Sequence, residues 1–152
     1  YGDHRDLHLS LRRQRQMCIR DSYYTVVAEQ PNGVMNGLYC LNSLVFPYYD
    51  TANKVEKNWW DKFKSIYGYD PNTGALYGYI FADILIEAVK RAGKELTVNS
   101  FVSSMESIKD FEDPLQTGSV TFSETRRQGT NISYFFQVQE ERFKVISGPI
   151  AY

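Results

Sequence analysis

Few side chains in this sequence are placed to do metal or acid–base chemistry. His4 and His8 are four residues apart, the spacing at which two histidines on one helix can share a metal ion. Arg5 follows His4, where the zinc-protease motif has a glutamate. The chain has no other histidine, so no serine or cysteine elsewhere has a nearby base in the sequence.

Paired carboxylates, a common source of general acids and bases, occur at Glu112-Asp113 and Glu140-Glu141. Both pairs lie in short polar stretches typical of solvated loops. The sequence contains no glycine-rich phosphate loop and no cysteine pair at metal-ligand spacing. We therefore expect no catalytic residues, no metal and no cofactor, and a binding protein rather than an enzyme.

The composition is that of a globular protein without a nucleic-acid or membrane partner. The 152 residues carry a net charge of -1, with 43% hydrophobic and 23% charged residues. No apolar run approaches the ~18 residues that a membrane span needs. The polar start lacks the apolar segment of a signal peptide, so any export signal is expected upstream of residue 1.

Residues 1–22 differ from the rest of the chain. They hold few large apolar side chains and a basic cluster at Arg12, Arg13, Arg15 and Arg20. The piece RRQRQMCIRDS resembles sequencing-adapter read-through at the ends of metagenomic reading frames. We interpret residues 1–22 as a non-native, poorly ordered leader and 23–152 as the folded part. The alternative is a basic arm for anionic partners.

The two cysteines do not define a disulfide framework. Cys40 lies in an apolar, strand-like run and is predicted to be a buried thiol. One disulfide between Cys18 and Cys40 stays open as an alternative.

The longest predicted element is a helix at Asn72–Ala92. Asp70 followed by Pro71 suits its N-terminus, with Thr73 as the competing cap, and Gly93 suits its end. Its few polar side chains form one stripe, and the other positions are apolar, aromatic or small; the polar residues are Asp83, Glu87, Lys90 and Arg91. A helix this apolar is expected to be covered on several sides.

Periodicity and turn residues predict an α/β chain. Further helices are expected at Thr51–Tyr67, with Val55, Trp59, Phe63 and Ile66 on its apolar face, and at Val98–Ile108, capped by Thr97 or Asn99. Tyr23–Ala28 is a short β-prone run, and strands are expected at Gly37–Phe46, Gly118–Ser123, Ile132–Gln139 and Arg142–Ile146. The last two should form an antiparallel hairpin, and the three helices should cluster. Since Glu140-Glu141 contains no glycine, a longer or differently shaped turn is expected there.

The order of these segments resembles one protein family. The resemblance is carried by GYDPNTGALYGYIFADILIEAVKRAGK, followed by LTVNSFVSSMESIKDF, GSVTFSETRRQGTN and SYFFQVQEERFKVI. These segments are similar to type I periplasmic solute-binding proteins, which serve ABC importers of branched-chain amino acids, amides and urea. The resemblance extends from about Gly33 to the end of the chain.

The resemblance implies a partial type I periplasmic-binding-protein fold with pieces of both three-layer lobes, residues 23–152 being the C-terminal part. It implies an extracytoplasmic, periplasmic subunit that captures a small amino acid or amide-like ligand between the lobes and meets ABC permease subunits. The alternative with the same fold is the ligand-sensing domain of a receptor or regulator. An enzyme with an unfamiliar site is the third class.

The resemblance also implies a binding region at the start of the long helix. In the family an aromatic residue just before this helix packs on the ligand; the matching position is Thr73, with Asn72, Leu76 and Tyr77 as neighbours. A helix N-terminus also favours a ligand carboxylate. The competing interpretation is that Thr73 only caps the helix and Tyr77 is core. Glu29 is the candidate partner for a ligand ammonium. Because the residues that grip the carboxylate in the other lobe are absent, the isolated chain is not expected to bind tightly.

Overall fold

The computed structural model describes residues 23–113, 115 and 118–151, so the prediction for residues 1–22 lies outside the described part. The described residues form two compact units. Unit 1 comprises residues 23–42 and 134–148, and unit 2 comprises residues 43–133 and 149–151. Helices and strands occur together, as the α/β prediction requires.

Unit 1 is built on a three-stranded sheet of order β1-β4-β5, whose strands are β1 (Tyr39–Asn42), β4 (Ile132–Gln139) and β5 (Arg142–Ala151). Strand β1 runs antiparallel to β4 and pairs Cys40 with Phe136. The buried Tyr23 ring contacts Phe136 and Phe143, with ring centroids 4.5 and 4.6 Å apart. These aromatic contacts form the core of unit 1.

The β-prone run at Tyr23–Ala28 does not form a strand. Thr25–Ala28 is the short helix α2, and the 3-10 helix η2 (Pro31–Gly33) follows it. The β-branched residues favoured a strand locally, but β preference depends strongly on packing. Here Tyr23 is buried between two sheet rings while Val26 faces solvent.

The turn between β4 and β5 consists of Glu140 and Glu141 alone, so of the two predicted alternatives, a longer or a differently shaped turn, the longer one is wrong. Both residues have left-handed backbones, with φ of 54° and 61°, as a tight two-residue hairpin turn requires. Glu141 holds the turn against η2, because its Oε1 accepts a hydrogen bond from the Gly33 amide at 3.1 Å. A hydrogen bond from Lys144 lowers the pKa of the Glu140 carboxyl.

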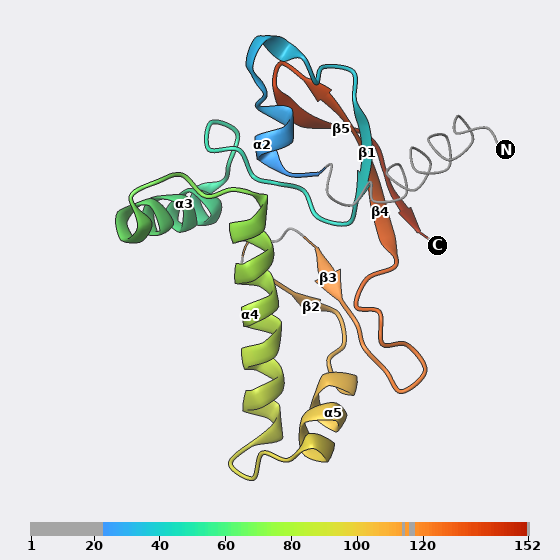
Figure 1. The fold of residues 1–152 in the computed structure, drawn as a ribbon. Coiled ribbons are helices and arrows are strands. Elements are labelled where there is room, and N and C mark those ends of the chain that lie inside the picture. Colours follow the sequence, from blue (N-terminus) through green and yellow to red (C-terminus); the bar gives the residue numbers. More distant parts are fainter. Residues whose placement is uncertain (1–22, 114, 116–117, 152) are drawn as a thin grey trace, which may run out of the picture. The chain divides into compact units, whose positions relative to one another are not determined.

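Unit 2 contains three helices and a short two-stranded sheet. The helices are α3 (Lys54–Tyr67), α4 (Thr73–Ala92) and α5 (Val98–Glu106), and the antiparallel strands are β2 (Phe111–Glu112) and β3 (Ser119–Val120). Helix α5 lies beside the C-terminal half of α4 (Figure 1). Thr97 caps α5, as predicted, and Gly93 ends α4 with a φ of 77°.

Several predicted boundaries shift. The strand predicted at Gly37–Phe46 is the shorter β1, and the strand predicted at Gly118–Ser123 is the shorter β3. Glu112, which was expected in a solvated loop, belongs to strand β2. Strand β5 continues beyond Ile146 to Ala151, although Pro149 lies within it.

An aromatic cluster surrounds α3. Trp59 is buried and contacts Tyr79 of α4, with ring centroids 6.0 Å apart. The Trp60 indole donates a hydrogen bond to the Pro47 carbonyl at 2.7 Å. Val55 and Ile66 are exposed, although their spacing of three or four residues from Trp59 and Phe63 predicted them on the apolar face. The aromatic rings, rather than the aliphatic stripe, fix this helix in unit 2.

Helix α4 is buried along one face. The buried positions recur every three or four residues and are Thr73, Leu76, Ile80, Ile84 and Ala88. The opposite side exposes large apolar residues, including Phe81 and Leu85. The prediction of cover on several sides is therefore wrong for the part of the chain that the structure describes: the short β2–β3 sheet lies beside the buried face, near Ile80 and Ile84, and the opposite side stays exposed.

Candidate ligand-binding site

The predicted binding region begins at the N-terminus of α4, where Asn72 is the cap. The Asn72 Oδ1 atom accepts a hydrogen bond from the Ala75 amide at 3.0 Å. The predicted cap Asp70 instead forms an ion pair with Lys64, with the Lys64 Nζ 2.9 Å from a carboxylate oxygen. Thr73, the competing cap, is the first helical residue. The interpretation of Thr73 as a cap is thus wrong.

The four predicted site residues fall into two groups. Thr73 and Leu76 are fully buried, whereas Asn72 is exposed and Tyr77 is half-buried. The Tyr77 ring stacks on Phe81, with centroids 5.7 Å apart and planes inclined by 23°. Asn72 and Tyr77 are therefore the members of this set that a solute could reach.

Phe81 was not among the predicted site residues. It lies one turn after Tyr77, and residues four apart on a helix share a face. Its exposed ring extends the aromatic surface that Tyr77 begins. The i, i+4 aromatic spacing was the signal in the sequence that could have identified it.

The first turn of α4 is electrostatically suited to an anion. It contains no acidic side chain, while Lys90 and Arg91 occupy the last turn. The amides of a first helical turn lack intrahelical partners, and the helix dipole adds partial positive charge there. Asn72 satisfies one of these amides. A carboxylate near this end would be stabilised by the remaining positive potential.

A cavity next to the buried face of α4 is too small for a solute. It encloses about 30 Å³ and is lined by Ile80, Ile84, Phe111 and Val120, among others. That volume admits a water molecule or two, because one water needs at least ~10–15 Å³ on this measure. The cavity is a packing defect within unit 2, not a pocket for an amino acid.

A larger, open groove of about 460 Å³ runs between α5 and the segment after β3, lined by Ser103, Glu106, Ser107, Lys109, Ser123, Glu124 and Thr125. Two of its charges are already engaged. Glu106 pairs with Arg127 at 2.9 Å, and Lys109 donates hydrogen bonds to the carbonyls of Glu106 and Phe122. The groove therefore offers a solute little unpaired charge.

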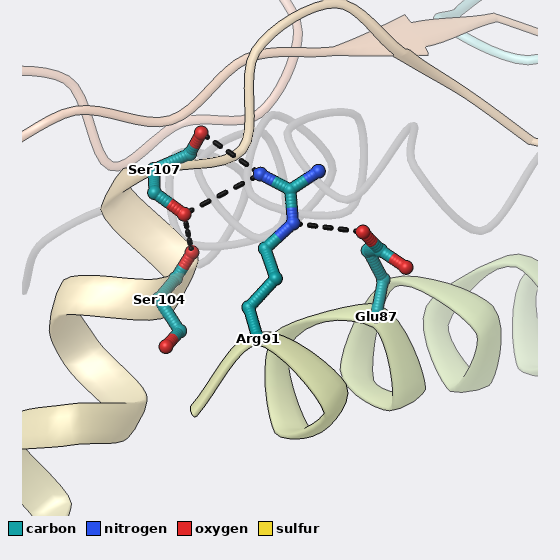
Figure 2. Close-up of polar contacts among 4 residues, drawn as sticks. All are labelled: Glu87, Arg91, Ser104 and Ser107. Atoms are coloured by element: carbon teal, nitrogen blue, oxygen red, sulfur yellow. Dashed lines mark hydrogen bonds and ion pairs between the residues drawn. The ribbon is translucent and has the colours of Figure 1, made fainter. Parts of the chain in front are cut away.

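Beside this groove, Arg91 joins α4 to the end of α5. Its Nε donates to Glu87 at 2.7 Å, and its Nη1 donates to the Ser107 carbonyl at 3.0 Å (Figure 2). The Ser107 hydroxyl in turn donates to the Ser104 carbonyl at 2.7 Å. This network is structural, because each polar atom that it uses is directed at another part of unit 2.

The remaining candidates for chemistry are a cysteine, a glutamate and the potential metal ligands. Cys40 is a free, buried thiol, and burial raises its pKa from 9.0 to about 12. Its predicted disulfide alternative involves Cys18, which lies outside the described residues. Glu29 is exposed and ends α2 in unit 1. Across residues 23–113, 115 and 118–151, no group of three potential ligands could hold a metal ion.

The sequence pattern of the periplasmic binding proteins matches residues 11–142. The chain belongs to the periplasmic binding protein family. No curated protein is similar enough to this periplasmic binding protein to count as a match. The resemblance inferred from the helix and strand motifs is thereby confirmed.

Solved structures support the same fold. A branched-chain amino acid ABC transporter protein from Thermus thermophilus with bound valine has a TM-score of 0.68 at 15% identity, over 84% of this chain and 37% of that one. A leucine binding protein from Thermotoga maritima gives 0.58 at 18%, over 81% and 33%. An extracellular ligand-binding receptor from Rhodopseudomonas palustris gives 0.61 at 14%, over 80% and 37%.

This periplasmic binding protein chain thus has a partial type I fold and spans about a third of the length of those structures. Its family consists of solute-binding proteins, and the family name, periplasmic binding protein, indicates a location outside the cytoplasm. In the described part of the chain, no helix is long and apolar enough to cross a membrane.

Proposed function

We propose that this chain is part of the extracytoplasmic solute-binding subunit of an ABC importer. Its ligand is a small amino acid or an amide-like solute, and its protein partners are the ABC permease subunits. The observation that carries the proposal is the family match over residues 11–142. The likeness to a protein with bound valine supports a small carboxylate as the solute class.

The start of α4 supplies one wall of the proposed cleft. A ligand carboxylate lies near the first helical turn, where no acidic side chain opposes it. The half-buried Tyr77 and its stacking partner Phe81 offer apolar contact to the ligand side chain. Thr73 and Leu76 are fully buried, so they stabilise the first turn of α4 and do not contact the solute.

The rest of the cleft lies in a longer protein of which these residues are a part. Chains of this fold are about three times as long as the region matched here. Ligand sites enclose most of the ligand surface, and half a cleft leaves that surface in water. We propose that units 1 and 2 are pieces of the two lobes, and that the ligand draws the lobes together in the complete protein.

Variants of the complete protein test this assignment. A thermal-shift screen with amino acids, amides and urea should identify a stabilising solute; binding at 100 times Kd adds about 2.7 kcal/mol. Tyr77→Ala should weaken that binding about tenfold or more. Val98→Ala, at an exposed position on α5, is the matched control. Equal binding by the wild type and Tyr77→Ala would show that the start of α4 does not line the site.

Sensing is a second candidate, favoured by the likeness to an extracellular ligand-binding receptor. The same cleft would then drive a conformational signal instead of delivery to a permease. Reconstitution of the complete protein with a candidate ABC permease distinguishes the two. Stimulation of ATP hydrolysis by the liganded protein supports transport, and its absence supports sensing.

A further inference from the structure

Two Asn-Gly pairs, Asn32-Gly33 and Asn36-Gly37, lie on the segment of unit 1 that leads from α2 to β1, beside the turn between β4 and β5 (Figure 1). An asparagine followed by glycine is prone to react with its own backbone. The nitrogen of a residue without a Cβ approaches the asparagine side-chain carbonyl with little steric hindrance. Both pairs carry the same reactive groups, so any difference in their reactivity has to come from the contacts that each pair makes in the fold.

The Asn36-Gly37 pair is held at both of its reacting groups. The Gly37 amide donates a hydrogen bond to the Val138 carbonyl of β4 at 2.8 Å. The Asn36 Oδ1 atom accepts a hydrogen bond from the Glu141 amide at 3.2 Å. The same side chain packs closely on Gly33, where an added Cβ would lie only 2.5 Å from the Asn36 Nδ2 atom. A reaction between the two groups therefore requires that both hydrogen bonds break and that the side chain leaves its place.

The Asn32-Gly33 pair differs at its side chain. The Gly33 amide donates a hydrogen bond to the Glu141 Oε1 atom at 3.1 Å. The Asn32 side chain is exposed, and it forms no hydrogen bond with any residue that the structure describes. Its backbone is left-handed, with a φ of 63°, which asparagine tolerates better than most residues. Only the hydrogen bond to Glu141 therefore has to open before the Gly33 nitrogen can reach the Asn32 carboxamide within the described part of the chain.

We infer that Asn32 is a site of spontaneous deamidation in this chain and that the fold protects Asn36. A base in the solvent removes the Gly33 amide proton, and the nitrogen attacks the Asn32 Cγ atom. The new N–Cγ bond closes a succinimide ring while the Cγ–Nδ2 bond breaks. The leaving nitrogen takes a proton from water and departs as ammonia. Water then opens the ring at either carbonyl and leaves aspartate or isoaspartate at residue 32, with no oxidation or reduction.

The Glu141 carboxylate slows this reaction. It accepts the amide hydrogen that has to leave before the attack, and its negative charge disfavours an amide anion beside it. The contacts that separate the two asparagines all lie within unit 1, since residues 23–42 and 134–148 contain every partner. They are therefore present in the 152-residue chain without the remainder of the complete protein.

Peptide mass spectrometry of the 152-residue chain tests the inference, after incubation for days at mildly alkaline pH in heavy-oxygen water. Each residue that deamidates during the incubation takes an oxygen atom from the solvent, which separates it from residues that reacted earlier. In the folded chain, Asn32 should deamidate at least about tenfold faster than Asn36, because Asn36 has to break more hydrogen bonds. In guanidinium chloride the two rates should agree within about threefold, since glycine follows both asparagines.

Three variants sharpen the comparison. Asn32→Gly keeps a residue suited to the left-handed backbone and removes the reacting side chain, so the deamidation left in that peptide belongs to Asn36. Glu141→Gly suits a φ of 61° and removes the carboxylate, so it should speed the reaction at Asn32 about threefold or more. Glu140→Gly, which removes the neighbouring carboxylate that pairs with Lys144, is the matched control and should stay within about twofold of the wild type.

A slow Asn36 in each variant that retains it shows that unit 1 is still folded, and circular dichroism checks the helices. Equal rates at the two asparagines of the folded wild type, a faster Asn36, or a Glu141→Gly chain that reacts no faster than Glu140→Gly would overturn the inference. None of these results depends on solute binding, so the proposed function is tested separately.

Discussion

The guanidinium Nη1 of Arg91 lies 3.0 Å from the carbonyl oxygen of Ser107, which caps the C-terminal end of α5 (Figure 2). A cation at this position meets the negative end of the α5 dipole. The contact joins the last turn of α4 to the end of α5, while Glu87 orients the guanidinium from one turn earlier. Arg91 is therefore the main polar link between the two helices.

Replacing Arg91 should destabilise unit 2 measurably. Arg91→Ala removes the hydrogen bonds to Ser107 and Glu87 and should lower the free energy of unfolding by about 1–2 kcal/mol. Glu87→Gln leaves the Ser107 contact in place and should cost only about 0.2–0.5 kcal/mol. Urea unfolding measures both, with the exposed Lys94→Ala as the control. Equal losses for Arg91→Ala and Lys94→Ala would show that the link contributes nothing.

The left-handed turn residues predict a stabilising substitution. Glu140→Gly removes the cost of a positive φ and loses only an exposed ion pair to Lys144, so it should raise the free energy of unfolding by about 0.5–1 kcal/mol. Glu141→Gly gains the same freedom but also loses the hydrogen bond from the Gly33 amide. Its gain in urea unfolding should be smaller. A destabilised Glu140→Gly, or a larger gain for Glu141→Gly, would contradict this account of the turn.

The Cys40 thiol predicts a loss of stability at high pH. Burial raises its pKa from 9.0 to about 12, so the folded state retains a proton that the unfolded chain releases. The contribution of the protonated thiol to the free energy of unfolding is complete below about pH 9 and is lost as the pH rises towards about 12. The loss is at most about 1.4 kcal/mol per pH unit. Urea unfolding is measured at intervals of one pH unit from pH 8 to 11. The free energy of unfolding should decline more steeply with pH for the wild type than for Cys40→Ala. Parallel profiles would mean that the thiol ionises without a penalty.

The start of α4 predicts which residue matters as a cap. Asn72→Ala removes the acceptor of the Ala75 amide and should cost about 1 kcal/mol of stability. Asp70→Ala breaks a solvent-exposed ion pair with Lys64 and should cost less than about 0.5 kcal/mol. Thermal unfolding of the two variants compares them directly. A larger loss for Asp70→Ala would place the helix start two residues earlier.

The sequence predicted elements well where local chemistry decides them. Strand β4 has the predicted bounds Ile132–Gln139, because its alternating residues match a sheet with one buried face. Gly93 ends α4 and Thr97 caps α5 for equally local reasons. The family resemblance depends on the order of many such segments. The family match over residues 11–142 confirms it.

Features that depend on distant contacts were missed. Tyr23 is held by Phe136 and Phe143, more than a hundred residues away, and the chain beside it turns into α2 instead of a strand. Nothing local to Phe111–Glu112 reveals β2, because its partner is β3. Burial also depends on neighbours: the apolar pattern of α4 does not say which of its faces this chain covers.

That the start of α4 meets the ligand stays a prediction, and the structure adds which of the predicted residues are exposed. Asn72 and Tyr77 reach the surface at the start of α4, while Thr73 and Leu76 are buried beneath them. Choosing among three neighbouring cap candidates requires the backbone geometry, since Asp70, Asn72 and Thr73 are all competent acceptors. The stacking of Tyr77 on Phe81 was readable from their spacing but was not used.

Calorimetric titration with leucine, isoleucine, valine and urea tests the central claim most directly, if it is done in parallel on the complete protein and on these 152 residues. The account predicts micromolar or tighter binding of one such small solute by the complete protein and no tight binding by the isolated chain. Micromolar binding by the isolated chain would contradict it, because the cleft would then be complete without the missing two thirds of the fold.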